Sequence, residues 1–393
     1  MDTMMTATMS TMTSQAPPEG HSLTSSDIVS ITMYVVIGTF GILGNSLVMI
    51  VFGLLAQQKS QVNMFIFDQA LIDGCTSVLL ILFGVVNAFR GRIMEYEDLT
   101  DPAPGEDLMG NVSASSSTSS GHFTHLSLAS AEFLCRFWWS RFFLFSCFAI
   151  STWNLTVMSI ERYFAVMHPM TYSRNFSKKR AIVMMSIIWL VAPIMQYVPA
   201  IFQYTCGPGT CTIQESWSRA AGVVLGVVLF IWEFVLPVCI MAFVYYKIIR
   251  EMRNKRDALK PKPLEPPSAT STPTRIPTNR GTAKVVHPSR NITMTLCILF
   301  AVYVICWTPN QLTFLQFNFG GPLNFTGAWY HITVTMAFLN CCVNPFIYAL
   351  RLQKFQKGMR KLMVCRWHRD RREKATRITE STSMNGLEST NAL

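Results

Sequence analysis

Three acidic side chains stand within or at the end of long apolar runs, where a carboxylate needs a specific partner. Glu161 is adjacent to Arg162 at the end of one run, and Asp73 and Glu233 lie within two others. An ionisable group in hydrocarbon is costly, so each one pairs with an opposite charge, carries a proton or binds a ligand. Such groups support ion pairing and recognition of cations rather than bond making. The sequence also lacks the His-Glu-x-x-His and Gly-x-Gly-Asp patterns of intramembrane and metal-dependent enzymes.

The elements that must position these residues are seven apolar segments. Half of the 393 residues are hydrophobic, only 14% are charged and the mean hydropathy is +0.30, which is unusual for a soluble domain. A helix of about 20 apolar residues crosses a hydrocarbon core of about 30 Å. The predicted fold is therefore an all-α membrane protein with a seven-transmembrane helix bundle, with spans at about 28–56, 61–88, 131–164, 181–202, 220–246, 292–317 and 328–350.

The charged connectors predict the orientation of the bundle. The net charge is +11, and the Lys and Arg residues gather in connectors on one side, which favours membrane orientation over binding of nucleic acid. The tail 1–27 and the long loop 89–130 are then extracellular, and the basic loop 247–290 and the tail 366–393 are cytoplasmic. Residues 351–365 form an amphipathic pattern that predicts a helix on the membrane surface.

Two modification sites and an outer group of cysteines follow from this orientation. The Asn-Val-Ser triplet at Asn111 is a glycosylation acceptor. Cys365, beside the basic amphipathic segment, is a palmitoylation candidate, with an unmodified thiol as the alternative. Of the eleven cysteines, Cys135, Cys206 and Cys211 lie on the outer side.

One motif in each span, in order, resembles the rhodopsin-like (class A) G-protein-coupled receptors, and among them the peptide and neuropeptide branch. The resemblance covers about 41–365 without the loops. It implies a plasma-membrane receptor that binds an extracellular ligand and activates heterotrimeric G proteins, with arrestin and receptor kinases as further partners. The motifs are Asn45, Asp73, Glu161-Arg162-Tyr163 with His168-Pro169, Trp189, Pro237 with Tyr245, Cys306-Trp307-Thr308-Pro309, and Asn344-Pro345-Phe346-Ile347-Tyr348.

The resemblance also implies how the bundle would switch. Glu161 would hold Arg162 at rest and release it towards Tyr245 and Tyr348 on activation, while prolines that break helix hydrogen bonds act as pivots. Met170 would insert into the G protein. The implied switch residues are Glu161, Arg162, Tyr163, Tyr245, Trp307, Pro309, Asn344, Pro345 and Tyr348, and a connector of unusually polar character consists of Thr152, Pro237 and Tyr303.

Two further features come from the resemblance. It places an allosteric sodium ion at Asp73, with oxygen ligands from Asn45, Ser151, Asn340 and Asn344; the alternative is a protonated, hydrogen-bonded Asp73. No other cofactor is expected. It also implies a disulfide from Cys135 to the second exterior loop. Cys211 is the preferred partner, but Cys206 stays open because Cys135 lies about two residues further from Arg162 than is usual in the family.

The outer halves of the spans are expected to line the ligand site. The seventh span has no lysine, which excludes a retinal pigment, and a transporter would show an internal repeat that is absent here. The charges and amides predict a polar, extended ligand such as a short peptide; a small non-peptide ligand or a constitutively active orphan are the alternatives. Glu233 and Arg141 could instead form a structural pair. The predicted pocket residues are Arg141, Gln196, Glu233, Asn310, Gln311 and His331.

Overall fold

The computed structural model describes residues 25–55, 60–95, 132–202, 204–207, 210–213, 219–258, 280–324 and 327–364. Within these ranges, the side chains at 25–27, 54–55, 87–95, 139, 173, 175, 204–219, 258 and 280–290 are not described. Asn111 and Cys365 lie outside the described residues.

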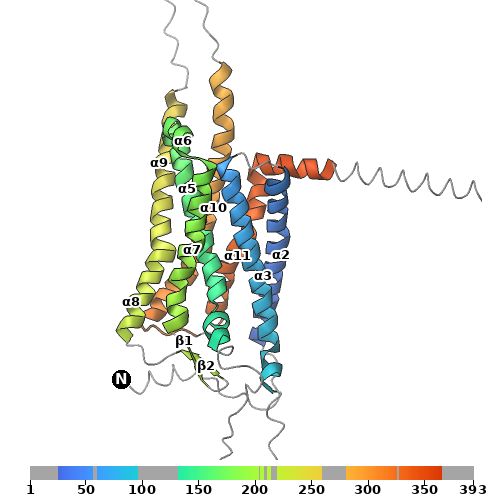
Figure 1. Cartoon of the computed structure of the whole chain (residues 1–393), viewed down its shortest axis with the longest axis vertical. Helices are drawn as coiled ribbons and strands as arrows, with labels where there is room; N and C mark the ends of the chain where they lie inside the picture. The colour runs from blue at the N-terminus through green and yellow to red at the C-terminus, as the bar shows by residue number, and fades with distance from the viewer. Residues whose placement is uncertain are drawn as a thin grey trace, which may run out of the picture.

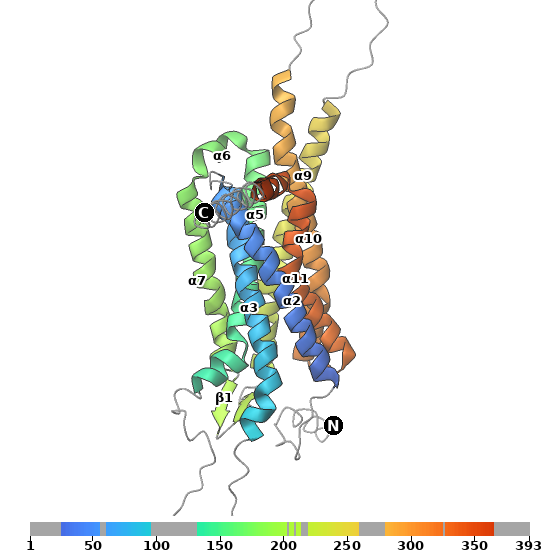
Figure 2. The ribbon, with the colours of Figure 1, turned by 90° about the vertical axis from the view of Figure 1, so that its right-hand side faces the viewer.

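Seven helices in the described part are long and apolar enough to cross a membrane, which confirms the predicted fold class. They run side by side along the long axis (Figure 1, Figure 2). Apolar runs form helices here because hydrocarbon offers no partner for backbone N–H and C=O groups. The elements are α2 (Ser25–Ile50), α3 (Gln61–Glu95), α5 (Phe142–Met167), α6 (Pro169–Asn175), α7 (Lys178–Phe202), β1 (Tyr204–Gly207), β2 (Thr210–Ile213), α8 (Arg219–Phe230), α9 (Leu236–Ala258), α10 (Arg280–Asn318) and α11 (Ala328–Arg351), with π-helical segments η2 (Val51–Leu55), η4 (Leu134–Trp139) and η5 (Ile231–Val235).

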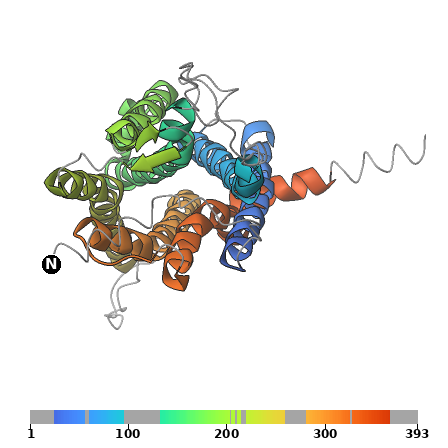
Figure 3. The same cartoon turned by 90° about the horizontal axis from the view of Figure 1, so that it is seen from below.

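The two ends of the bundle differ. One end, at the top of Figure 1, carries α6, the projecting ends of α9 and α10, and a helix over 353–364 that lies across the bundle axis; we call it the basic end. The other, the hairpin end, carries the antiparallel strands β1 and β2, paired from Tyr204 with Ile213 to Gly207 with Thr210. Seen from this end, the strands lie over one side of the bundle (Figure 3), and β1 packs against α7 and η4.

The third span is not the continuous helix that the sequence predicts over 131–164. The π-helical segment η4 ends at Trp139, and Arg141 adopts a left-handed backbone conformation (φ 58°) before α5 begins. A non-glycine residue with positive φ interrupts a helix and costs about 1–3 kcal/mol. The Ser140 hydroxyl offsets part of this cost by accepting from the backbone N–H of Phe142 at 3.2 Å. The break lies between Cys135 and α5.

Two helices at the basic end are longer than predicted. α9 continues to Ala258, beyond the predicted end at 246, and α10 begins at Arg280, before the predicted start at 292. The added part of α9 is rich in good helix formers, and Lys255 pairs with Glu251 one turn earlier at 3.2 Å. The predicted basic loop 247–290 is therefore partly helical.

The amphipathic segment after α11 packs on the bundle through its apolar face. Leu352 and Phe355 are buried, and the Phe355 ring stacks on Phe52 with centroids 6.3 Å apart. On the same side of the bundle, α2 approaches α11 closely at Gly44, where a Cβ atom would lie 2.9 Å from the Pro345 ring. This close packing fixes α2, α11 and the 353–364 helix as one unit at the basic end.

Candidate functional site

The basic end of α5 carries a buried ion pair. Arg162 donates from Nε to Glu161 Oε2 at 2.5 Å and from Nη2 to Glu161 Oε1. Tyr172 of α6 donates its hydroxyl to the same Glu161 oxygen, with Gln61 Oε1 of α3 at 3.2 Å. Glu161 is fully buried and Arg162 nearly so, so removing either partner would leave an uncompensated buried charge. The structure thus pairs Arg162 with Glu161, the arrangement expected of the resting switch.

Two groups beside this pair have shifted pKa values. Burial and the Glu161 carboxylate raise the pKa of Tyr172, so its phenol stays protonated and donates to the carboxylate. Partial burial and the Arg162 guanidinium lower the pKa of Lys354 in the 353–364 helix. Lys354 Nζ lies 3.3 Å from Asn63 Oδ1 of α3. Arg162 and Lys354 therefore bring two positive charges close to the Glu161 carboxylate.

The tyrosines expected to receive Arg162 after its release lie deeper in the bundle. The Tyr245 hydroxyl lies 2.7 Å from Ser159 Oγ. Tyr348 is fully buried, and its hydroxyl has no hydrogen-bond partner among the described residues. An unpartnered buried hydroxyl costs about 1–3 kcal/mol, so Tyr348 offers a bond that a displaced guanidinium could make.

One residue of the predicted switch, Tyr163, and the predicted G-protein contact, Met170, lie at the surface of the basic end. Tyr163 is half-buried, and its ring contacts Phe164 and His168 with centroids 5.6 and 6.0 Å away. Met170, in the first turn of α6, is 85% exposed. An exposed methionine beside the ion pair is a suitable contact for a partner that approaches this end.

Asp73 of α3 is the centre of a buried hydrogen-bond cluster. Its Oδ1 accepts from Ser151 Oγ of α5 at 3.0 Å, and its Oδ2 accepts from Asn344 Nδ2 of α11 at 2.7 Å. Gln69, one helical turn before Asp73, donates Nε2 to both carboxylate oxygens at 3.1 Å. Sequence reasoning missed Gln69, although an amide one turn before a buried acid was a readable signal.

The predicted sodium ligands differ in how far their polar atoms are already hydrogen-bonded. Donors rather than free oxygen atoms surround Asp73. Asn45 donates Nδ2 to two backbone carbonyls, those of Gly41 and Cys341. Asn340 is buried but forms no hydrogen bond to Asp73 among the described residues. Sodium bound by Asn45, Ser151, Asn340 and Asn344 therefore stays a prediction: Asn45 Oδ1 is buried without a hydrogen-bond partner among the described residues, whereas the Asp73 carboxylate already accepts hydrogen bonds from three side chains.

Two helix prolines leave backbone carbonyls that accept hydrogen bonds from side chains of other helices. Pro237 cannot donate to the Glu233 carbonyl four residues earlier, and Tyr303 of α10 donates its hydroxyl to that oxygen at 2.9 Å. Pro345 likewise cannot donate to the Cys341 carbonyl, which accepts from Asn45 Nδ2 at 2.9 Å. Each freed carbonyl thus becomes a polar contact between helices.

The connector predicted from Thr152, Pro237 and Tyr303 is assembled around the Tyr303 hydroxyl. Besides the bond to η5, this hydroxyl interacts with the side chain of Thr152 on α5. Trp307 lies one turn further along α10, with its ring 6.3 Å from Tyr303 and 5.0 Å from Phe148. One phenol therefore joins the third, fifth and sixth spans below the outer half of the bundle.

The outer cluster is built on Glu233 in the π-helical segment η5. Its carboxylate accepts from Gln196 Nε2 of α7, and the Gln311 side chain of α10 also interacts with it. Gln311 is buried, and its Oε1 has no hydrogen-bond partner in the described part of the chain. The carboxylate pairs with no Lys, Arg or His among the described residues. The structure thus replaces the alternative of a Glu233–Arg141 ion pair with a carboxylate between two amides.

The other predicted pocket residues are placed differently. Arg141 interacts electrostatically with Tyr34 of α2. His331 Nδ1 lies 3.0 Å from Ser30 Oγ, so His331 joins α11 to α2. Asn310 is half-buried on α10, next to Gln311. Gln196, Glu233 and Gln311 therefore form the group that the structure brings together, whereas Arg141 and His331 face the first span.

Cys135 in η4 is disulfide-bonded. The backbone register pairs Cys206 of β1 with Cys211 of β2, and β1 is the strand that packs against η4. The side chains of both hairpin cysteines lie outside the description, so the choice of Cys211 stays a prediction, and the packing of β1 favours Cys206.

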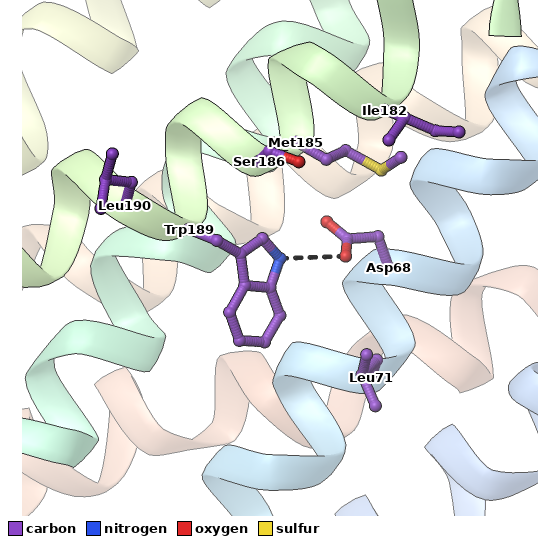
Figure 4. Close-up of a pocket in the computed structure, with 7 residues that line it drawn as sticks. All are labelled: Asp68, Leu71, Ile182, Met185, Ser186, Trp189 and Leu190. Atoms are coloured by element: carbon purple, nitrogen blue, oxygen red, sulfur yellow. Dashed lines mark hydrogen bonds between the residues drawn. The ribbon is translucent and has the colours of Figure 1, made fainter. Parts of the chain in front are cut away.

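A groove of about 500 Å³ lies on the outer face of the bundle between α3 and α7 (Figure 4). Trp189 and Asp68 point toward one another across it, and Trp189 Nε1 donates to Asp68 Oδ1 at 3.1 Å. Asp68 Oδ2 is buried without a hydrogen-bond partner among the described residues. The walls are mostly apolar, with Leu71, Ile182, Met185, Ser186 and Leu190.

Known proteins resemble the chain across these spans. The pattern of the 7 transmembrane receptor (rhodopsin family) matches residues 107–348, more than half of the chain. Galanin receptor 2b of Danio rerio is 26% identical over 267 residues, 65% of this chain and 63% of that protein. Galanin receptor type 2 of Rattus norvegicus is 23% identical over 231 residues (56% and 55%), and melatonin receptor type 1A of Gallus gallus is 26% identical over 234 residues (54% and 56%). The chain thus spans 55 to 63% of the length of these curated relatives.

Proposed function

Because the chain belongs to the rhodopsin family of seven-transmembrane receptors, we propose that it is a cell-surface receptor that binds an extracellular peptide and activates heterotrimeric G proteins. The N-terminus and the hairpin end face the exterior, and the basic end faces the cytoplasm. The support for this orientation is the gathering of Arg174, Lys178, Lys179 and Arg180 at one end, since cytoplasmic loops carry an excess of Lys and Arg.

One observation carries the proposal. Glu233 offers a carboxylate between two amides in the outer half of the bundle, and the carbonyl of the same residue is bound by Tyr303. Tyr303 in turn interacts with Thr152 of α5, the helix that ends in Glu161 and Arg162. A ligand that moves η5 would therefore act on α5 through one hydroxyl, which is the differential contact that a two-state switch requires.

The chemistry of this site favours a cationic group on the ligand. A half-buried carboxylate with amide neighbours and no cation of its own among the described residues gains most from a guanidinium or ammonium. The unpartnered Gln311 Oε1 would accept a further N–H from the ligand. Relatives named as galanin receptors favour a peptide. A relative named as a melatonin receptor keeps a small ligand as the second candidate.

The cytoplasmic part of the proposal concerns the basic end. Activation breaks the Glu161–Arg162 pair, and Arg162 turns towards Tyr245 and Tyr348, opening this end to the G protein. Arrestin and receptor kinases then act on the same face. Glycosylation at Asn111, palmitoylation at Cys365 and a disulfide from Cys135 to the hairpin complete the proposed mature receptor.

The test is G-protein activation in cells that express the full chain, measured against a library of short peptides that includes basic and amidated ones. We expect peptides with a cationic residue to activate the wild type. Glu233→Gln should reduce their potency roughly 30-fold, equivalent to about 2 kcal/mol for the loss of one partner of a buried charge pair. Surface expression should stay near normal, because glutamine keeps an acceptor for Gln196.

The matched control is Glu132→Gln, which makes the same change at an exposed glutamate paired with Arg136. This variant should leave potency unchanged. High basal signalling with no response to any peptide would support a constitutively active orphan instead. Equal loss of surface expression and signalling in Glu233→Gln would show that the carboxylate is structural.

A further inference from the structure

The side-chain nitrogen of Gln69 lies among the oxygen atoms of Asp73 and Ser151, two of the residues predicted to bind sodium. This Nε2 atom lies 3.1 Å from each oxygen of Asp73 and 2.5 Å from Ser151 Oγ. These three oxygens are the carboxylate and hydroxyl that would ligate a hard cation at the centre of the bundle. All three residues are buried, with exposed fractions of 2% or less. A neutral NH₂ group with two protons is thus enclosed by the oxygen atoms of the predicted ion site.

The orientation of this amide is fixed by a second contact. Gln69 Oε1 accepts from Asn154 Nδ2 of α5 at 3.0 Å, and the same nitrogen lies 3.1 Å from the Phe65 carbonyl. With its oxygen held by Asn154, Gln69 must present its nitrogen to Asp73. Turning the amide over would place Gln69 Oε1 against the Asp73 carboxylate and Gln69 Nε2 against Asn154 Nδ2, and the hydrogen bonds on both sides would be lost. Hydrogen bonds to Asn154 on one side and to Asp73 on the other therefore fix the position of Gln69 Nε2.

Asp73 and Ser151 are already hydrogen-bonded, although Asn45 Oδ1, another predicted ligand, is buried without a partner among the described residues. Ser151 donates its single proton to Asp73 Oδ1 and accepts from Gln69. Asn344 presents Nδ2, a donor, to Asp73 Oδ2. Asp73 therefore receives hydrogen bonds from three side chains, and a sodium ion would have to displace the Gln69 amide. A displaced Gln69 amide would lose its hydrogen-bond partners in this buried cluster, which costs about 1–3 kcal/mol for each unpaired group.

We propose that the Gln69 amide permanently takes the place of sodium at Asp73, so that the chain has no sodium-dependent allostery at this site. The third, second and seventh spans are joined there by a continuous chain of side chains, from Asn154 through Gln69 and Asp73 to Asn344. A cation-free centre of this kind couples α5 to α11 by hydrogen bonds that no change in salt can remove. The inference concerns the bundle itself and does not depend on the proposed ligand.

The test uses the full-length chain purified in detergent, with the unfolding temperature measured in sodium, potassium and choline chloride at equal ionic strength. We expect the wild type to unfold at the same temperature in all three salts. Gln69→Leu removes the amide while keeping an apolar side chain, and it should gain a sodium-specific rise of about 2–4 °C, the shift for roughly 1 kcal/mol of ligand stabilisation. The double variant Gln69→Leu with Asp73→Asn should lose that rise.

Two outcomes of these measurements would overturn the proposal. A sodium-specific rise in the wild type that Asp73→Asn abolishes would overturn the proposal. A folded Gln69→Leu without any sodium response would show that something other than Gln69 excludes the ion, and would overturn it as well. If Gln69→Leu does not fold, Gln69→Ala opens the same space with a smaller side chain, and the salt comparison on the wild type stands independently of either variant.

Discussion

At the scale of single residues, two contacts between helices form at backbone carbonyls that a proline four residues later cannot bond. In a membrane, a freed carbonyl must find a partner inside the protein. The Glu233 carbonyl before Pro237 is bound by Tyr303, and the Cys341 carbonyl before Pro345 is bound by Asn45. Each of these carbonyls thus accepts a hydrogen bond from a side chain of another helix. A change in the backbone at either proline therefore requires this hydrogen bond to break.

Removing the Tyr303 hydroxyl should destabilise the bundle. Tyr303→Phe keeps the ring, which packs near Trp307, but leaves the Glu233 carbonyl without its donor. We expect a loss of about 1–3 kcal/mol, the cost of an unsatisfied buried acceptor, seen as a lower unfolding temperature in detergent. Basal G-protein activation should rise, because the contact with Thr152 that restrains α5 is lost with the same hydroxyl.

Thr152→Val separates the two contacts of Tyr303. This variant loses the interaction with Thr152, but the bond from Tyr303 to the Glu233 carbonyl stays. It should unfold at a temperature between those of the wild type and Tyr303→Phe. Equal stability of Tyr303→Phe and the wild type would contradict the view that this hydroxyl holds the kink.

At the scale of elements, the sequence predicts most of the helices but not their interruptions. The spans follow from apolar length, because lipid leaves a backbone no alternative to the helix. The break at Arg141 has no glycine or proline to announce it, so the sequence alone predicts a continuous helix there. The sequence analysis also missed Gln69 as a member of the cluster around Asp73. Asp73, Ser151 and Asn344 do meet, but only the spatial arrangement shows that Gln69 reaches into the same space.

The packing of α3 against α7 should be improved by removing a charge. In the groove of Figure 4, Trp189 satisfies one oxygen of Asp68, while the other is buried without a partner among the described residues. Asp68→Asn keeps the acceptor for Trp189 and ends the cost of a carboxylate facing hydrocarbon. We expect a higher unfolding temperature in detergent for Asp68→Asn and a lower one for Trp189→Phe, which removes the present hydrogen-bond donor to Asp68. A lower temperature for Asp68→Asn would mean that the carboxylate itself has a favourable partner.

At the scale of the whole molecule, the two ends have separate chemistry joined by one path. The outer half holds Glu233 between amides, the centre holds Asp73 in a closed set of hydrogen bonds, and the basic end holds Arg162 against Glu161. The path from Glu233 through Tyr303 to α5 connects the first of these with the last. Movement at Glu233 would therefore be transmitted to α5 through the Tyr303 hydroxyl.

The orientation of the bundle gives a direct prediction. An epitope placed before Met1 should be labelled by antibody on intact cells, whereas an epitope after Leu393 should be labelled only after the cells are permeabilised. The physical reason is the asymmetry of Lys and Arg between the two ends. Labelling of the C-terminal epitope on intact cells would reverse the assignment of the ends, and with it the placement of the ligand site.

The last prediction concerns the surface that the basic end offers to the G protein. Met170 is 85% exposed in the first turn of α6, beside Tyr172, which donates to Glu161. Burying an exposed methionine side chain in a partner stabilises the complex by about 1.5–3 kcal/mol. Met170→Ala should therefore lower G-protein activation roughly tenfold or more at limiting G protein, with surface expression and basal stability unchanged. Met363→Ala is the matched control, since Met363 is 60% exposed on the 353–364 helix at the same end. If both variants signal like the wild type, α6 does not contact the G protein; if both are equally impaired, the loss is a general effect of surface methionines and not a docking contact of Met170.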